Sequence, residues 1–165
     1  MNHPQILPEC HADTLLVELL GFDPQHIFGI GQVLITLPRN FANRMAVGII
    51  DNDKRKPPDV SQFEIETTVA GIERRKKADT KHTLLVITPA FEDWVFENAR
   101  AVNIDPAKYG FRTPKYFRDV CKKADADANQ QLKQFLNALK QKGAPGFKQL
   151  KTWICEGAGL VEAET

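Results

Sequence analysis

Two carboxylates spaced two residues apart directly follow a continuous apolar run. Residues 46–50 read Ala-Val-Gly-Ile-Ile, and Asp51 and Asp53 come next, separated by Asn52. A short run rich in β-branched residues predicts a strand buried on both faces, as in parallel sheets covered by helices. Residues i and i+2 at the end of a strand share a face, so both carboxylates can point at one place. Oxygen ligands of this kind suit Mg²⁺ or Mn²⁺ better than zinc.

A second acid favours this metal-binding interpretation. Residues 5–9 read Gln-Ile-Leu-Pro-Glu, a short strand-like run that ends in Glu9. Ligands of parallel sheets gather beyond the carboxyl ends of the strands, so we expect Glu9 and Asp51 at the same edge of adjacent or near-adjacent strands. Two alternatives remain open. The residues from Asp51 to Pro58 are also typical of a solvated turn. The alternative role of Glu9 is only to offset the dipole of the helix that follows it.

The spacing of apolar residues predicts the elements that position these acids. Leu15, Leu16, Leu19 and Leu20 recur at helical spacing, and Gly21 follows as a helix stop. A second apolar run over residues 33–37 is either helix or strand. Residues 84–87 read as another buried strand, and a helix follows over residues 90–97. This order predicts an α/β fold with a doubly wound, mainly parallel sheet flanked by helices.

The C-terminal part is helical in pattern. Apolar residues at helical spacing predict helices after Thr113, over residues 128–142 and over residues 147–155. At 165 residues the chain fits one domain, since domains average about 150 residues. We therefore expect a single domain over residues 1–165, with a sheet-forming core in residues 1–100 and a helical extension in residues 101–165 packed on it.

The N-terminal half resembles the toprim domain of topoisomerases, primases and old-family nucleases. The likeness rests on Glu9-Cys-His-Ala-Asp13 with its Leu-rich helix, and on Gly48-Ile-Ile-Asp51-Asn-Asp53-Lys54. In that family a glutamate ends the first strand and a later strand ends in an Asp-x-Asp pair, which together hold Mg²⁺ for phosphodiester chemistry. The resemblance thus implies Glu9, Asp51 and Asp53 as catalytic metal ligands. Cys10 departs from the family, where glycine often follows the glutamate.

A later segment adds a fourth candidate acid by the same resemblance. Phe91-Glu-Asp-Trp94 follows the predicted strand at residues 84–87. It looks like the Phe-Glu-x-Trp-like element of small standalone toprim-like proteins, which implies a catalytic role for Glu92. The other interpretation is that Glu92 only offsets the helix dipole while Trp94 belongs to the core.

Basic residues lie close to the acids in the sequence. Lys54 and Arg55 directly follow the Asp pair and are candidate contacts to a phosphate or a nucleic acid. Residues 74–77 read Arg-Arg-Lys-Lys, and we favour a solvated loop and hairpin edge over a nucleic-acid contact there. The net charge of +1 argues against strong non-specific affinity for a polyanion.

The cysteines and the hydropathy of the chain indicate the cellular compartment that we expect. Cys10, Cys121 and Cys155 are odd in number and widely spaced, which fits neither a disulfide framework nor a zinc site. Free thiols indicate a reducing environment, and no stretch is apolar enough for a membrane span. We expect a cytoplasmic protein with no membrane partner.

Three functional classes follow. The first is Mg²⁺- or Mn²⁺-dependent phosphodiester or phosphoryl chemistry on nucleic acid, a nuclease-like activity with Glu9 as acid/base or metal ligand. The second is a non-catalytic, regulatory toprim-like module that works with a separate subunit such as an ATPase. The third is a phosphoacceptor signalling domain in which one strand-end Asp is phosphorylated.

Overall fold

Five strands form one mixed sheet in the computed structural model, which describes residues 2–52 and 56–161. The strands are β1 (Ile6–Pro8), β2 (Ala46–Asp51), β3 (Phe63–Val69), β4 (Ile72–Lys77) and β5 (His82–Ile87). Their order across the sheet is β1-β2-β5-β4-β3. β1, β2 and β5 are parallel, whereas β4 and β3 run antiparallel to their neighbours. The α/β fold is confirmed, and the expected parallel arrangement holds for the β1, β2 and β5 half of the sheet.

Within the described residues, six α-helices and three short 3₁₀ helices accompany the sheet. The α-helices are α1 (His11–Leu19), α2 (Ile30–Asn40), α3 (Phe91–Ala101), α4 (Pro114–Cys121), α5 (Gln130–Gln141) and α6 (Pro145–Ala158). The 3₁₀ helices are η1 (Pro58–Gln62), η2 (Pro106–Tyr109) and η3 (Ala126–Ala128). The apolar run at residues 33–37 is part of helix α2. The helices predicted for the C-terminal part are confirmed as α4, α5 and α6.

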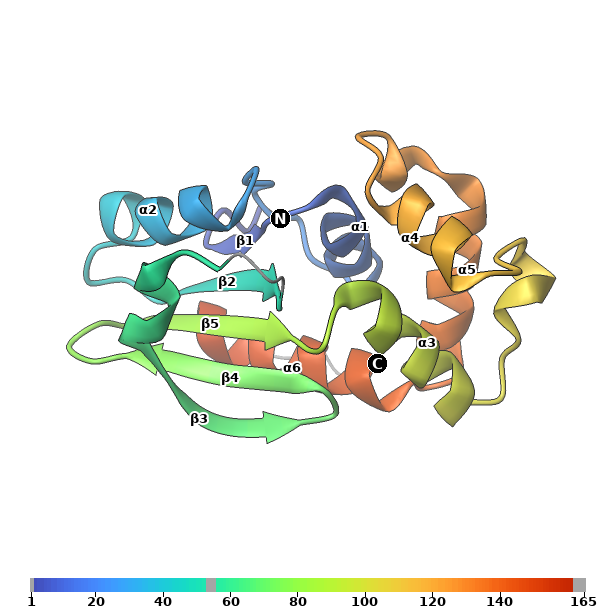
Figure 1. Cartoon of the computed structure of the whole chain (residues 1–165). Coiled ribbons are helices and arrows are strands. Elements are labelled where there is room, and N and C mark those ends of the chain that lie inside the picture. The colour runs from blue at the N-terminus through green and yellow to red at the C-terminus, as the bar shows by residue number, and fades with distance from the viewer. Residues whose placement is uncertain (1, 53–55, 162–165) are drawn as a thin grey trace.

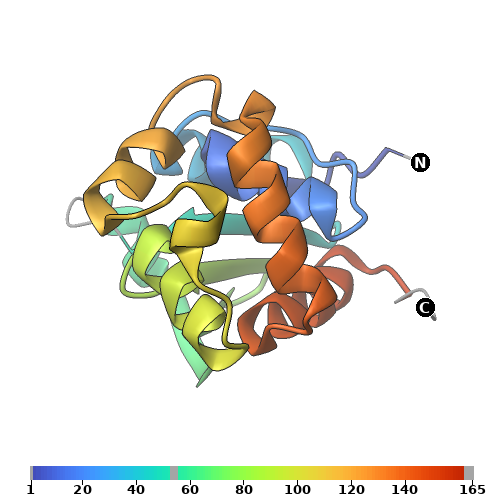
Figure 2. The same ribbon diagram turned by 90° about the vertical axis from the view of Figure 1, so that its right-hand side faces the viewer.

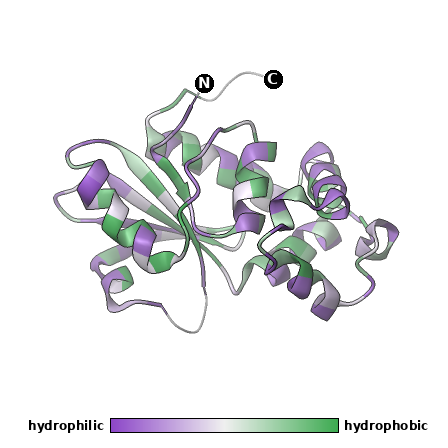
Figure 3. Ribbon diagram, turned by 90° about the horizontal axis from the view of Figure 1, so that it is seen from above, coloured by the Kyte–Doolittle hydropathy of each residue, from purple (hydrophilic) through white to green (hydrophobic). Residues whose placement is uncertain are grey.

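The continuous apolar run of β2 is explained by helices on both faces of the sheet. Val47 and Ile49 pack into the larger core cluster with α1, α3, α5 and α6. Ala46 and Ile50 pack into the second cluster with α2 and η1. A strand covered on both faces has no solvent side on which polar residues would alternate. Figure 3 shows hydrophobic residues along the central strands and both hydrophobic and hydrophilic residues on the helices.

The C-terminal helices share the larger core with the sheet. Phe117 of α4, Phe135 of α5 and Ile154 of α6 are fully buried in the same cluster as Ile49. β2 and β5 point toward the side where α3, α4 and α5 lie (Figure 1), and Figure 2 looks onto these helices in front of the sheet. The carboxyl ends of the parallel strands therefore face the helical part. Within the described residues, the helices are all too short or too polar to cross a membrane.

The basic run at residues 74–77 lies in a hairpin, as expected, but on an interior strand of the sheet, so the expected edge position is wrong. It belongs to β4, which pairs with β5 on one side and with β3 on the other. Arg74 contacts Glu66 at 3.2 Å, and Arg75 contacts Glu73 at 2.6 Å. These carboxylates neutralise the two arginines within the chain, so the pairing lets a strongly charged strand lie inside the sheet.

Candidate functional site

Glu9 and Asp51 lie at the same edge of the sheet because β1 and β2 are adjacent and parallel. Pro8, the last residue of β1, pairs with Ile49, and the Glu9 amide donates to the Ile49 carbonyl at 3.1 Å. Asp51 ends β2, opposite Ile87 at the end of β5. Both acids thus follow buried strands at the carboxyl edge, where parallel sheets place their ligands.

A pocket of about 230 Å³ opens at this edge. It is lined by residues from the ends of β1 and β2, the starts of α1 and α3, and the end of α4: Glu9, Cys10, His11, Ala12, Asp51, Phe91, Glu92, Cys121 and Lys122. Three candidate acids, Glu9, Asp51 and Glu92, share this pocket. The helical C-terminal part completes it with Cys121 and Lys122.

Asp51 is held in place by the first turn of α3. Its Oδ1 accepts a hydrogen bond from the Phe91 amide at 3.1 Å. Ala90 precedes this helix and has no side chain that could cap it. Asp51 therefore satisfies an amide that the helix itself leaves unpaired, and its carboxylate lies at the positive end of the helix dipole.

Asp13 lies buried behind the pocket and was not among the residues proposed from sequence. Only 2% of Asp13 is exposed, and its Oδ1 accepts from the Cys10 amide at 2.8 Å. The Cys10 Sγ in turn accepts from the Asp13 amide at 3.5 Å, which completes a capping box at the start of α1. Burial, followed by the negative charge of Glu9, raises the pKa of Asp13 well above its ordinary range. The spacing of a cap residue and an acid three positions later is the local signal for this arrangement.

The donor set fits a hard divalent cation. Potential ligand atoms of Glu9, Cys10 and Asp13 lie within 4.8 Å of one another. Burial, and then the charge of Asp13, raises the pKa of the Cys10 thiol, which leaves it protonated and a weak ligand. The carboxylate oxygens of Glu9 and Asp13 are the harder donors of this group, and oxygen ligands are the ones that Mg²⁺ and Mn²⁺ prefer.

Negative charge is concentrated around the pocket, and Lys122 faces it. Burial raises the pKa of the Cys121 thiol most, and the charges of Glu92, Asp13 and Asp51 raise it further. The carboxylates therefore repel one another and disfavour any additional negative charge unless a cation lies between them. Lys122 lines the pocket and, within the part of the chain that the structure describes, forms no ion pair.

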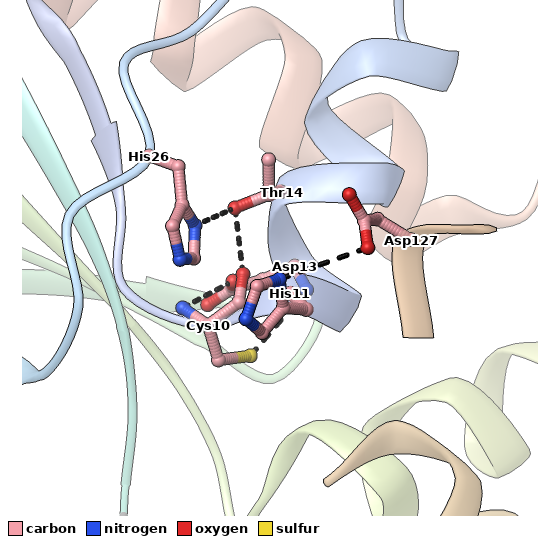
Figure 4. Close-up of polar contacts among 6 residues, drawn as sticks. All are labelled: Cys10, His11, Asp13, Thr14, His26 and Asp127. Atoms are coloured by element: carbon pink, nitrogen blue, oxygen red, sulfur yellow. Dashed lines mark hydrogen bonds and ion pairs between the residues drawn. The ribbon is translucent and has the colours of Figure 1, made fainter. Parts of the chain in front are cut away.

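His11, which lines the pocket at the start of α1, forms a pair with His26, and Figure 4 shows the polar contacts of both residues. The rings of His11 and His26 stack with centroids 4.6 Å apart, and His11 Nδ1 lies 3.7 Å from Asp127 Oδ1. The Thr14 hydroxyl donates its single hydrogen to the Cys10 carbonyl at 2.6 Å, so it accepts from His26 Nδ1 at 2.7 Å. Burial, and then proximity to His11, lowers the pKa of His26.

The structure brings together three of the acids proposed from sequence. Glu9, Asp51 and Glu92 line one pocket. Asp53, Lys54 and Arg55, proposed as a further ligand and as phosphate contacts, lie outside the described residues. Trp94 is a core residue with its indole nitrogen donating to the Ala70 carbonyl, and this agrees with the structural interpretation of that side chain. No feature of the sequence marked Lys122 as a site residue, because only the packing of α4 places it at the pocket.

Comparison of the chain with known protein families, with characterised proteins and with solved structures found no match.

Proposed function

We propose that the protein is a divalent-cation-dependent enzyme of phosphodiester chemistry on nucleic acid, with a toprim-like centre. The observation that supports this most is the gathering of Glu9, Asp51 and Glu92 around one pocket at the carboxyl edge of parallel strands. These acids come from three separate segments of the chain, so their convergence is not a consequence of local sequence.

Mg²⁺ or Mn²⁺ is the proposed cofactor, held by Glu9 and Asp51 and, on the sequence evidence, by Asp53. When bound, such a cation stabilises the negative charge that develops on a phosphoryl group and lowers the pKa of water. Its charge would also offset the negative charge of Glu9, which adds to burial in raising the pKa of Asp13.

The remaining residues act on the substrate and on protons. Lys122 is positioned to contact a substrate phosphate, since it is the cation among the described residues that line the pocket. Glu92 lies on the α3 side of the same pocket and is the candidate to accept a proton from the attacking water. Asp51 keeps its orientation through the Phe91 amide.

A cleavage assay on the full chain tests this proposal. Purified protein is incubated with supercoiled and with single-stranded DNA, and with RNA, in Mn²⁺, in Mg²⁺ and in EDTA. We expect cleavage only with a divalent cation. Glu9→Gln should abolish it while leaving the circular dichroism spectrum unchanged, because the exchange keeps size and removes the charge that the cation requires.

Glu97→Gln is the matched control for Glu92→Gln. Both residues belong to α3, but Glu97 lies outside the carboxylate pocket and is exposed. Glu92→Gln should reduce cleavage strongly, and Glu97→Gln should leave it unchanged. Equal activity in wild type, Glu9→Gln and EDTA would identify a contaminating nuclease. Mn²⁺ binding without any cleavage would favour the regulatory module instead.

A further inference from the structure

An aromatic cluster made by His11, His26 and Phe28 stands beside the carboxylate pocket. The Phe28 ring lies across the two stacked imidazoles, at 5.3 Å from His11 and 4.1 Å from His26 in edge-to-face geometry. Phe28 is nevertheless 67% exposed. The ring is packed on one side by the two imidazoles and is open to solvent on the other, so it offers an apolar face to a ligand.

The backbone around Phe28 is tied to the strand that carries Glu9. The amides of Gln25, Ile27 and Gly29 donate to the carbonyls of Ile6, Pro8 and Glu9, at 3.0, 3.1 and 3.2 Å. Because these hydrogen bonds come from every second residue, residues 25–29 run alongside β1 at the edge of the sheet. The backbone that carries Phe28 is therefore held beside Glu9 before any ligand arrives, so binding does not have to order this segment.

The imidazoles under the ring are also fixed. Thr14 accepts from His26 Nδ1, and Asp127 pairs with His11. His11 belongs both to this cluster and to the lining of the carboxylate pocket. A ligand that covers Phe28 would consequently lie one side chain away from the candidate metal centre.

We propose that Phe28 is a stacking platform for an unpaired nucleobase of the substrate, which makes the preferred substrate single-stranded. The inference rests on the proposed function and specifies its substrate class. A flat base would cover the exposed face of Phe28 while the phosphate of the same strand reaches the pocket past His11. A base inside a duplex is already stacked on both faces and cannot make this contact without being unpaired.

Equilibrium binding tests this platform without any need for turnover. Fluorescence anisotropy of a labelled oligothymidylate of about ten nucleotides, in EDTA and in Mn²⁺, gives the dissociation constant. Phe28→Ala should weaken binding about tenfold. Phe28→Tyr should bind as tightly as wild type because the aromatic ring is kept. Ile65→Ala is the matched control, since Ile65 is exposed on β3, far from the pocket in the sheet order.

A strand of equal length that carries abasic sites completes a double-mutant cycle. Wild type should lose about tenfold in affinity for the abasic strand, whereas Phe28→Ala should bind both strands alike. Equal loss in both proteins would show that the bases are read elsewhere and would overturn the platform. The platform would also be overturned by unchanged oligothymidylate binding in Phe28→Ala. It would be overturned as well if wild type bound a blunt duplex with equal affinity, or did not bind oligothymidylate at all.

The two proposals fail separately. If the oligonucleotide binds in a Phe28-dependent manner but is not cleaved, the enzymatic proposal is wrong and the stacking platform stands. If cleavage does not depend on Phe28, the platform is wrong and the enzymatic proposal stands. If Phe28→Ala instead alters the sedimentation of the protein and leaves oligonucleotide binding unchanged, the exposed ring serves contact between two copies of the chain and the platform is wrong.

Discussion

Asp51→Asn separates the metal-binding role of Asp51 from its structural role. The Asn side-chain oxygen can still accept from the Phe91 amide, so the start of α3 keeps its hydrogen bond. Loss of the negative charge at this helix start costs about 0.3–1 kcal/mol. Relief of repulsion from the neighbouring carboxylates opposes that cost. Without metal, the variant should therefore unfold close to the wild-type temperature.

With metal, wild type and Asp51→Asn should diverge. A cation at about a hundred times its dissociation constant stabilises the folded state by about 2.7 kcal/mol. For a chain of this length, each kcal/mol raises Tm by about 2–4 °C, so saturating Mn²⁺ should raise the wild-type Tm by about 5–11 °C. Differential scanning calorimetry in EDTA and in Mn²⁺ measures both values. The variant should show little of this rise.

Asp105→Asn is the matched control. The Asp105 carboxylate also accepts from a backbone amide, that of Ala107 at 3.0 Å, and it begins η2 away from the pocket. This variant should keep the full Mn²⁺ response. If Asp51→Asn keeps it too, the ions bind elsewhere and the assignment of Asp51 as a ligand is wrong.

Further predictions concern packing, pH and charge. Gly48→Ala should lower the free energy of unfolding by about 1–3 kcal/mol in urea titrations, because its Cβ would lie 2.7 Å from Val33 Cγ1. Burial, and then His11, lowers the pKa of His26 from 6.5, so the folded state binds fewer protons than the unfolded state. The free energy of unfolding should therefore fall as pH falls below about 6.5, and it should fall less in His26→Gln. Lys122→Met should weaken single-strand binding and reduce its salt dependence, whereas Lys123→Met, next to it and outside the pocket lining, should have a smaller effect.

Strands and helices with strong apolar periodicity could be predicted from sequence, whereas the position of β4 in the interior of the sheet could not. The strand of residues 46–50 and the helix that begins near His11 are local patterns, and both are present. β4 reads Ile-Glu-Arg-Arg-Lys-Lys, which no strand rule selects for the interior of a sheet. Its two arginines are tolerated because they pair with carboxylates: Arg75 with Glu73 of the same strand, and Arg74 with Glu66 of β3 and Glu156 of α6, which reach it only in the folded chain.

The same distinction applies to the candidate site. Glu9 and Asp51 were found from sequence because each ends an apolar strand run, and the carboxyl edge of a parallel sheet is a general ligand position. Glu92 entered through a family resemblance. Lys122 could not be found in this way, because it reaches the pocket only when α4 packs against the core. Phe28 likewise shows its exposure and its neighbours only in the folded chain.

The measurement that tests the metal centre most directly is an anomalous difference map from a crystal of the full chain grown with Mn²⁺. The proposed centre predicts a peak in the pocket, with carboxylate oxygens of Glu9 and Asp51 both at about 2.1 Å from the ion. The same crystal form of Asp51→Asn should lose the peak. A peak coordinated by neither residue, or none at saturating Mn²⁺, would contradict the assignment of this pocket as a metal centre.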